Sequence, residues 1–556
     1  MKKRRPMLWV IKRIRRRIPA LIIMTATNIL VSILGVSFAL GTKEVIDSAA
    51  AMRAHEFYAA CGVLIAIIVG ILSLSVFFRH MKDKILADLD RDWKRDLLHR
   101  LLNGEFQKVS AFHTGELINR LGNDVRKVDE GVTGLLPGVA AMLTQLVAAM
   151  VVLISMEPWF AVLIVAAGVM VVFLTSLMRR MLKDLHKRVS ECEGRVSGFI
   201  QETLEKLLMV QAMDVSEEME RRTDVLLNER YNMQRKRKNV SLLAGTGISI
   251  MSYAASFLAL VWCAYGILKG RMSFGELTAV TQLVGQLQGP FTNLSSIIPQ
   301  YVGIVAAAER LMELEEVCGD VLIVADDGQE LYRKLSGITA KNLTFAYDRE
   351  PVFSNANFVL NKGEFAVVTG ASGIGKSTLI KLMLGIFRPA EGGLYIKGND
   401  GEREIDRSTR RLFAYVPQGN LLLSGTLREN LTITRPEATE EEINHAIYIS
   451  CMEELVSRLP DGLDTVLGES GAGLSHGEAQ RLAIARAVLG GAPVLLLDEI
   501  TSALDIDTER TVLNRIKQLE GRTCIAVTHR AAALEIADVK LEVSGNGVFR
   551  KELQMR

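Results

Sequence analysis

The strongest signal in this 556-residue sequence is Gly370-Ala371-Ser372-Gly373-Ile374-Gly375-Lys376-Ser377-Thr378. It matches the phosphate-binding loop pattern G-x-x-x-x-G-K-[ST]. The pattern follows a predicted strand at 365–369 and opens a predicted helix at 378–385, a context that an ordinary glycine-rich turn does not need. In such a loop, successive backbone N–H groups and the helix N-terminus bind phosphate oxygens. We therefore expect Lys376 to reach the β- and γ-phosphates of a nucleotide and Ser377 to ligate Mg²⁺.

A second signal lies downstream, where four apolar residues precede two acids in Val494-Leu495-Leu496-Leu497-Asp498-Glu499. A continuous apolar run is typical of a buried parallel strand, and ligands of open α/β sheets bind at the carboxyl ends of such strands. Alone, two acids at a strand end are more often ordinary surface. Because they follow a phosphate-binding loop, we expect Asp498 to be a Mg²⁺ partner and Glu499 to polarise the attacking water.

The N-terminal half carries six long stretches without Asp, Glu, Lys or Arg, at residues 18–41, 58–78, 132–156, 158–178, 242–268 and 277–308. A bilayer core requires about 20 apolar residues in a helix, whereas soluble helices of this length usually carry charge on one face. We therefore predict six membrane-spanning helices rather than buried core helices. The sixth stretch contains Gln282, Gln286 and Gln288, and two interpretations stay open. These amides either face a water-filled cavity or bond neighbouring helices.

Basic residues predict the orientation of the spans. Nine Lys and Arg side chains lie within Met1–Arg17, so the positive-inside rule places the N-terminus in the cytoplasm, and six crossings return the C-terminus there. Residues 1–17 are also typical of an amphipathic helix on the inner leaflet. The charged segments 79–131 and 179–241 predict helical extensions that project roughly 35–40 Å into the cytoplasm. We expect a multi-pass protein of the cell (inner or plasma) membrane.

Composition limits the remaining classes of function. The mean hydropathy is +0.22 although 23% of the residues are charged, so apolar and polar residues must be segregated. The 66 basic and 63 acidic residues give a net charge of +3, which argues against a nucleic-acid partner. The six cysteines have neither metal-ligand spacing nor the density of a disulfide scaffold. We predict a multidomain chain with an all-α six-helix transmembrane domain at 18–315, a linker at 316–337 and an α/β phosphate-loop nucleotide-binding domain at 338–556.

These motifs, in this order, resemble exporter-type half-transporters of the ATP-binding cassette (ABC) superfamily, strongly over 340–535 and more loosely over the membrane half. The resemblance implies that Tyr347 stacks on adenine and that Gln418 contacts Mg²⁺ and the attacking water. It also implies that Asp505 belongs to the loop that links the two ATP sites. His529 resembles the switch histidine that contacts the γ-phosphate.

The stretch Leu474-Ser475-His476-Gly477-Glu478 resembles the family's signature motif, which is usually Leu-Ser-Gly-Gly-Gln. The resemblance implies that Ser475, Gly477 and Glu478 meet the nucleotide bound by the opposite subunit. His476 stands where the family has glycine, and Glu478 stands where it has glutamine. Two interpretations stay open: the histidine is a neutral change, or it lies near the phosphates and makes turnover pH-dependent.

The membrane half carries looser resemblances to the family's two coupling helices. Such a helix lies across the cytoplasmic tip of the membrane domain and docks on the cassette. The segment 112–125 resembles the surroundings of the first coupling helix, and the second is expected near 210–216.

One phosphate loop and one signature motif imply, by the same resemblance, that two chains meet head to tail to form two composite ATP sites. A homodimer is the simplest assembly, and a heterodimer stays open. We expect an exporter that uses ATP and Mg²⁺, alternates access and moves an amphipathic or neutral cargo such as a drug, lipid or peptide. Membrane lipid is an expected partner. The alternatives are an ATP-gated channel or regulator and an importer with the exporter fold. Ion coupling is disfavoured because the spans contain no carboxylate.

Overall fold

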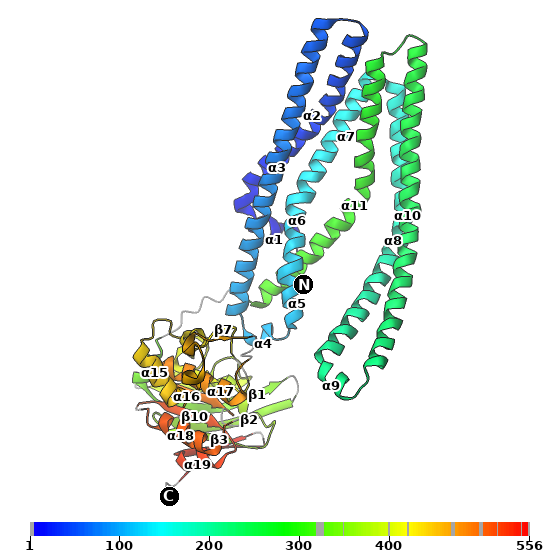
Figure 1. Ribbon diagram of the computed structural model, residues 1–556. Helices are drawn as coiled ribbons and strands as arrows, with labels where there is room; N and C mark the ends of the chain where they lie inside the picture. The colour runs from blue at the N-terminus through cyan, green and yellow to red at the C-terminus, as the bar shows by residue number, and fades with distance from the viewer. Residues whose placement is uncertain are drawn as a thin grey trace. The chain divides into compact units, whose positions relative to one another are not determined.

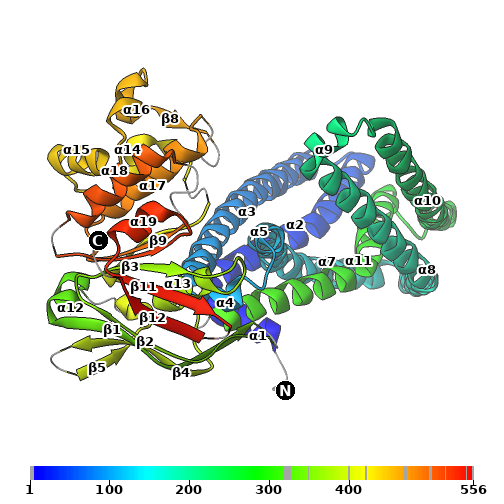
Figure 2. The same ribbon diagram turned by 90° about the horizontal axis from the view of Figure 1, so that it is seen from below.

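The computed structural model describes residues 5–318, 327–347, 350–398, 401–419, 422–468, 473–499, 504–519, 521–545 and 547–553. The chain divides into two compact units. The helical unit comprises Met1–Leu102 and Phe112–Val317, and the α/β unit comprises Asn103–Ala111 and Cys318–Arg556. Figure 1 and Figure 2 show the elements of both units from two directions. The predicted order, a helical domain followed by an α/β domain, is confirmed.

The helical unit is built from long helices (Figure 1). Its elements are α1 (Pro6–Arg13), η1 (Arg15–Arg17), α2 (Ile18–Ala50), α3 (Ala54–Asn103), α5 (Thr114–Asn119), η2 (Arg120–Asp124), α6 (Val125–Glu130), η3 (Gly131–Leu135), α7 (Leu136–Met156), α8 (Pro158–Glu205), α9 (Leu207–Ala212), α10 (Ser216–Leu268) and α11 (Phe274–Cys318). η1 is a 3₁₀ turn, whereas η2 and η3 are π-helical turns. Each of the six uncharged stretches lies in helical backbone. α3, α8 and α10 continue through charged sequence, which confirms the predicted helical extensions.

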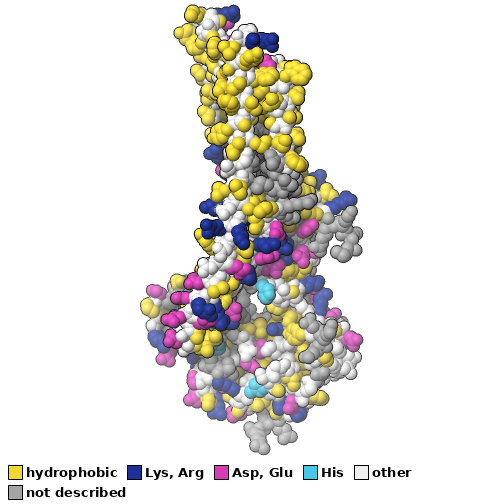
Figure 3. Space-filling model, turned by 90° about the vertical axis from the view of Figure 1, so that its right-hand side faces the viewer, with side chains coloured by type: hydrophobic (Ala, Val, Ile, Leu, Met, Phe, Trp, Pro, Cys, Tyr) yellow, Lys and Arg dark blue, Asp and Glu magenta, His cyan; other side chains and the backbone are white. Residues whose placement is uncertain are grey.

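Apolar side chains cover the outside of the helical unit. On the face drawn in Figure 3 they form a broad band with charged side chains at both ends. Along α3, for example, Ile65, Val69 and Leu72 are each more than half exposed, as expected of side chains that face lipid. In the described part of the chain, the helical segments long and apolar enough to cross a membrane are Arg15–Ala50, Ala54–Asn103, Thr114–Met156 and Ser216–Leu268, with Pro158–Met170 as a shorter apolar helix. The chain is therefore a multi-pass membrane protein.

Two features shape the packing of α11. Pro290 and Pro299 lie inside this helix, and proline lacks the N–H that would bond the carbonyl four residues earlier. Such positions bend helices, and Figure 1 shows α11 bent along its length. Nearby, a Cβ atom added to Gly131 would lie only 2.3 Å from Ile304 Cδ1. Glycine at this position therefore permits the close approach of η3 and α11.

The α/β unit contains two larger sheets and a small two-stranded one. Its helical elements are α4 (Phe106–Val109), α12 (Gly328–Lys334), α13 (Lys376–Met383), η4 (Arg407–Leu412), α14 (Leu427–Thr432), α15 (Glu440–Ile449), α16 (Glu453–Arg458), η5 (Gly462–Asp464), α17 (His476–Leu489), α18 (Ile506–Lys517) and α19 (Ala531–Ile536). Its strands are β1 (Leu335–Tyr347), β2 (Glu350–Asn361), β3 (Phe365–Thr369), β4 (Glu391–Gly398), β5 (Gly401–Glu404), β6 (Phe413–Val416), β7 (Gly425–Thr426), β8 (Val466–Leu467), β9 (Val494–Asp498), β10 (Thr523–Val527), β11 (Val539–Ser544) and β12 (Gly547–Glu552).

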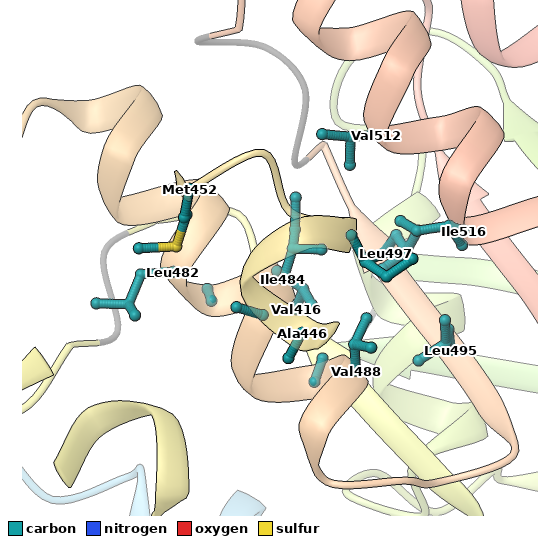
Figure 4. Packing of buried hydrophobic residues seen from close by; sticks show 14 of the residues in the cluster. Val416, Ala446, Met452, Leu482, Ile484, Val488, Leu495, Leu497, Val512 and Ile516 are labelled. Carbon is teal, nitrogen blue, oxygen red and sulfur yellow. The ribbon is translucent and has the colours of Figure 1, made fainter. Parts of the chain in front are cut away.

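The central sheet has the strand order β12-β11-β3-β10-β9-β6 and is parallel except for β12. An antiparallel sheet, β2-β1-β4-β5, packs on one side with α13 in the shared core. Helices α14, α15, α17 and α18 pack on the other side, where Leu482 and Leu497 belong to one buried cluster (Figure 4). Every residue of β3 and β9 is buried. Burial on both faces explains the continuous apolar runs of these strands.

The helix after the phosphate-binding loop differs slightly from its prediction. α13 begins at Lys376, two residues before the predicted start, and ends at Met383. Gly375 immediately before it has φ +110°, a conformation that favours glycine and ends the loop sharply. The first turn of the helix therefore includes the lysine itself.

The predicted linker at 316–337 contains more regular structure than a simple connector. α11 continues through Cys318, and α12 occupies Gly328–Lys334. The Asp327 side chain caps α12 by accepting a hydrogen bond from the Gln329 amide at 3.0 Å, as acidic N-caps do. β1 then begins at Leu335, and residues 319–326 lie outside the described residues.

Candidate nucleotide-binding site

The register of the central sheet gathers the sequence motifs at one edge. Val527 of β10 pairs with Val368 of β3 on one side and with Asp498 of β9 on the other. Val416 of β6 pairs with Leu497 of β9. These four strands are adjacent and parallel, so their carboxyl ends lie side by side. The predicted site residues lie at these ends. The loop 370–378 follows β3, Asp498 ends β9 and Glu499 follows it, His529 comes after β10, and Gln418 comes after β6.

The loop after β3 has the backbone that phosphate binding requires. Gly370, Gly373 and Gly375 all have positive φ, and a Cβ atom at Gly370 would lie 2.5 Å from the Val543 carbonyl oxygen. The Lys376 side chain is buried, and its Nζ donates hydrogen bonds of 2.9 Å to the carbonyls of Gly370 and Ala371. The ammonium group thus lies within the loop, where it is close to any phosphate bound by the loop amides.

Ser377 and Asp498 meet beside this loop. The Ser377 hydroxyl donates to Asp498 Oδ1 at 3.1 Å, and the Tyr415 hydroxyl donates to Oδ2 at 3.4 Å. Asp498 is 1% exposed. Burial raises the pKa of its carboxyl, the neighbouring Glu499 adds to this, and the two hydroxyl hydrogen bonds oppose it. Burial likewise raises the pKa of Tyr415, so its hydroxyl stays a donor.

This oxygen-rich pair fits a magnesium ion. Mg²⁺ prefers hydroxyl, carboxylate and carbonyl oxygens, and Ser377 and Asp498 present a hydroxyl and a carboxylate within hydrogen-bond distance. The described hydrogen bonds to Asp498 come from neutral hydroxyls, so no guanidinium or ammonium group satisfies its charge there. The donor set therefore suits a divalent cation held between α13 and β9.

Glu499 and Gln418 also lie together. Gln418 Nε2 donates a hydrogen bond to Glu499 Oε2. Glu499 has φ +50°, which is unusual for a residue with a side chain, and its backbone N–H donates to the Val527 carbonyl at 2.9 Å. The strained backbone at the end of β9 thus turns Glu499 out of the strand direction and next to Gln418. Strain of this kind is often stored at functional sites.

Tyr347 connects an aromatic cluster to the loop. Its ring meets those of Phe345 and Phe387 edge-on, with centroids 5.1 Å and 5.6 Å apart. Its hydroxyl shares a 3.1 Å hydrogen bond with Thr378 Oγ1. Tyr347 remains 44% exposed, so the packed ring retains area on which a base can stack.

The signature stretch caps α17. The Ser475 hydroxyl accepts a hydrogen bond from the Glu478 amide at 3.3 Å, and the Glu478 carboxylate accepts one from the Ser475 amide at 2.8 Å. This is a reciprocal capping box. Arg458 of α16 also pairs with Glu478. Burial raises the pKa of Glu478, but the bonds from Ser475 and Arg458 outweigh it, so the pKa lies below its usual value.

The remaining predicted residues have simpler surroundings. Asp505 caps α18 by accepting the Thr508 amide at 2.9 Å, and this backbone hydrogen bond lowers its pKa. His476 and His529 are exposed. In the described part of the chain, no hydrogen bond joins Ser475, Gly477 or Glu478 to the loop 370–378. The structure therefore gathers the predicted residues except for the signature turn and Asp505.

A short segment just before 112–125 makes its contacts with the α/β unit. Asn103–Ala111 belongs to the α/β unit. There the Arg407 guanidinium donates to the backbone and side-chain oxygens of Asn103, and the Phe106 ring lies 6.3 Å from that of Phe387. Phe387 in turn contacts Tyr347, so an aromatic series leads from this segment to the loop. Sequence reasoning missed Phe106, Phe387 and Tyr415, and only their aromatic character near the motifs could have suggested them.

The segment 112–125, predicted to surround the first coupling helix, makes contacts within the helical unit, and its coupling role stays a prediction. Arg120 is buried in the helical unit, with its guanidinium 4.7 Å from the Phe112 ring centroid. It donates to Glu116 at 2.7 Å and to Glu313 at 3.0 Å. These contacts hold the segment against α11.

Comparisons with known proteins agree with this arrangement. Residues 21–291 match the ABC transporter transmembrane region, and residues 353–502 match the ABC transporter model. The chain is 30% identical over 465 residues to an uncharacterized ABC transporter ATP-binding protein, YwjA, of Bacillus subtilis, covering 83% of this chain and 80% of that protein. It is 27% identical over 502 residues to an ATP-dependent lipid A-core flippase of Syntrophus aciditrophicus, covering 87% and 80%. A solved bacterial Atm1-family ABC exporter with ATP bound shares the fold, with a TM-score of 0.77, 23% identity, and coverage of 97% and 95%.

Proposed function

The chain belongs to the ABC transporter family, as a half-transporter whose ATPase is coupled to transport, and we propose that two copies of it form a homodimeric exporter. A heterodimer with a related chain would use the same surfaces. The protein lies in the cell membrane, with the cassette and both termini on the cytoplasmic side, as the basic N-terminal residues indicate. The observation that carries the proposal is the strand edge that joins Ser377 to Asp498 and Gln418 to Glu499.

The strand edge supplies most of a hydrolysis site. The loop amides and Lys376 bind the phosphates, and Tyr347 stacks on the base. Ser377, Asp498 and Gln418 are the residues that would hold Mg²⁺, which when bound neutralises charge on the phosphate oxygens. Glu499 orients and polarises the attacking water, and His529 contacts the γ-phosphate. Gln418 holds the Glu499 carboxylate at the edge until water and nucleotide arrive.

The signature turn completes the site of the partner chain. Ser475, Gly477 and the N-terminus of α17 offer hydrogen-bond donors and a positive helix end to an anion. The Ser475 amide already donates to Glu478, so the Ser475 hydroxyl and the Gly477 amide are the donors that this turn offers to a γ-phosphate of the opposite subunit. The Glu478 carboxylate is used within its own chain, and Arg458 offsets its charge. Because the negative charge is neutralised within the chain, glutamate replaces the family's glutamine at this position without repelling the bound phosphate.

Alternating access follows from differential affinity. ATP at two composite sites has more partners when the two cassettes are closed, so it favours the closed state. Hydrolysis removes the γ-phosphate contacts and resets the opposite state. The segment Asn103–Ala111, whose Phe106 reaches the Phe387–Tyr347 cluster, transmits the change between the nucleotide site and α3.

The cargo is amphipathic or neutral. A pocket of 620 Å³ in the helical unit is bounded by α2, η3, α7 and α11. No Asp, Glu, Lys or Arg lines it among the described residues. Gln286 Nε2 donates to the Gly35 carbonyl of α2 at 2.9 Å, while its buried Oε1 has no partner among the residues that the structure describes. Both sequence interpretations therefore apply to this residue, since it bonds a neighbouring helix and also offers an acceptor. The amide side chains that line the pocket are Asn28, Gln145, Gln286, Asn293 and Gln300.

The test is ATP hydrolysis by the purified protein in lipid nanodiscs with a panel of neutral, amphipathic and charged compounds. We expect one neutral or amphipathic class to stimulate turnover, and Glu499→Gln to abolish turnover while ATP still binds. Glu441→Gln, an equivalent change at an exposed position of α15, serves as the control. ATP binding without turnover in the unmodified chain would instead support a gated channel or regulator and would contradict the homodimeric pump. Uptake of the stimulating compound into inside-out vesicles distinguishes export from import.

A further inference from the structure

The N-terminal helix α1 has two different faces. Trp9 is half-buried and Val10 is buried on the inner face, toward α3 and α11. Leu8 and Ile11 lie on the outer face and are 53% and 47% exposed. α1 is followed by the segment Arg15–Ala50, which is long and apolar enough to cross a membrane. The helix therefore lies where that span enters the bilayer, with two apolar side chains available to the lipid boundary.

The basic residues in and just after α1 also fall into two groups, one directed toward the protein and one exposed. Arg13 pairs with Asp96 and with Glu315, and Arg17 pairs with Asp88 at 2.9 Å and Asp92 at 3.1 Å. In contrast, three exposed cations have no acidic partner in the described part of the chain, namely Lys12, Arg15 and Arg16. The inward cations are thus neutralised by the protein, and the outward ones are left for an external anion.

A single carboxylate connects the inner face of α1 to the end of α11. Glu315 accepts hydrogen bonds from Trp9 Nε1 at 2.7 Å and Arg13 Nη1 at 2.6 Å, and it pairs with Arg100 of α3 at 3.2 Å. The Arg13 guanidinium lies against the buried Trp93 ring, 5.0 Å from its centroid. Charge-assisted bonds of this kind are the stronger ones in proteins. A shift of α1 therefore displaces Glu315, which lies three residues before α11 ends at Cys318.

We propose that the outer face of α1, together with Arg15 and Arg16 of the adjoining η1, binds the headgroups of anionic phospholipids and that Glu315 transmits this binding to the end of α11. Three unpaired cations beside two exposed apolar side chains are complementary to an anionic leaflet, and each cation near such a surface contributes roughly a fivefold change in partition. Because the chain continues from α11 toward the cassette, the state of α1 sets the rate of ATP turnover. This inference goes beyond the proposed export and depends only on membrane insertion and ATPase activity.

The test compares full-length protein in nanodiscs of phosphatidylcholine alone and of phosphatidylcholine mixed with phosphatidylglycerol. Two quantities are measured: the phosphatidylglycerol that detergent-purified protein retains from a mixture, and the ratio of ATPase rates in the two kinds of nanodisc. We expect enrichment of phosphatidylglycerol and a rate that changes several-fold with it. The combined variant Lys12→Gln, Arg15→Gln, Arg16→Gln should lose both responses. Arg333→Gln, Lys397→Gln, Arg411→Gln removes the same charge from exposed positions of the α/β unit and should keep both.

The transmission step is tested separately. Glu315→Gln should retain the enrichment of phosphatidylglycerol but lose most of the rate response. Trp9→Phe removes a single hydrogen bond to Glu315 and provides a milder variant if Glu315→Gln folds poorly; it should weaken the rate response partially. The proposal is overturned if the triple variant responds to phosphatidylglycerol as the unmodified chain does. It is also overturned if Glu315→Gln and Trp9→Phe both leave the rate response intact, or if only another protein or a second copy binds this face.

Discussion

The strand edge of the α/β unit and the amide-lined pocket of the helical unit are opposite solutions to ligand binding. The strand edge gathers ionisable groups, a buried carboxylate and a strained glutamate, and most of their polar atoms already have partners. The pocket gathers neutral amides, and the buried Gln286 Oε1 has no partner there among the described residues. Charged groups with fixed partners suit a single ligand chemistry, whereas neutral amides suit a range of cargo. The difference separates the step that must be uniform, ATP hydrolysis, from the step that varies with the cargo.

The largest effect should come from Lys376→Ala at the strand edge. The substitution removes the ammonium group that lies within the loop, so ATP hydrolysis should fall by about 10²-fold or more with every cargo. Turnover is measured in nanodiscs with and without the stimulating compound. A loss confined to one cargo would break the comparison, because it would show that the edge also discriminates between cargoes.

A smaller effect is expected from Tyr415→Phe, which removes one hydroxyl donor from Asp498. Groups that orient a metal ligand typically change metal affinity by roughly 10–100-fold. We expect the Mg²⁺ concentration for half-maximal turnover to rise within this range, while the maximal rate at saturating Mg²⁺ changes little. Titration of turnover with Mg²⁺ measures both quantities, and Tyr448→Phe at an exposed position of α15 is the matched control. An unchanged Mg²⁺ dependence would mean that Asp498 does not hold the ion.

At the pocket, Gln286→Leu should alter the response to cargo but not the basal ATPase rate. Loss of one buried hydrogen bond to a ligand corresponds to about tenfold in affinity. The measurement is the concentration of cargo that half-maximally stimulates turnover. Ser37→Ala on α2, a partly exposed position that does not line the pocket, is the control. If basal turnover fell together with cargo affinity, the pocket and the strand edge would not be separable.

The smallest effect concerns Glu478, whose folded pKa is lowered. A lowered carboxyl pKa contributes stability above the unfolded value, and that stability is lost as pH falls through the folded value. Glutamine can still form the capping box but not the ion pair with Arg458, so Glu478→Gln should cost a few tenths to about 1 kcal/mol at neutral pH. The cost should shrink as the pH falls below about 4.5, the ordinary carboxyl value. Denaturant unfolding at several pH values checks this, and a pH-independent difference would exclude the charge as its cause.

The gathering of residues at the strand edge was largely predictable from the sequence. Each motif follows a short apolar strand, and the carboxyl ends of adjacent parallel strands must lie together. The loop 370–378, Asp498 and Glu499 are therefore assigned to one site by the sequence pattern. The roles of these residues in hydrolysis stay predictions.

Other contacts could not be predicted, because no local pattern encodes them. Tyr415 is one residue of a short strand, and only the pairing of β6 with β9 brings it to Asp498. Trp9 and Glu315 are 306 residues apart in the sequence. Likewise, no local pattern indicates that Phe106 meets Phe387. Periodicity predicts which face of an element is buried, but not what it meets.

The two prolines of α11 have a mechanical consequence. Pro290 leaves the Gln286 carbonyl without its helical donor, and Pro299 does the same for the carbonyl of residue 295. α11 therefore consists of stiff helical segments connected at two hinge points. Pro290, at one of these hinge points, lines the pocket. Because a helical hydrogen bond is already missing at this point, α11 bends there without breaking further hydrogen bonds. We expect the pocket to adapt to molecules of different length at little energetic cost, while the segments on either side of the hinge points stay stiff enough to carry force.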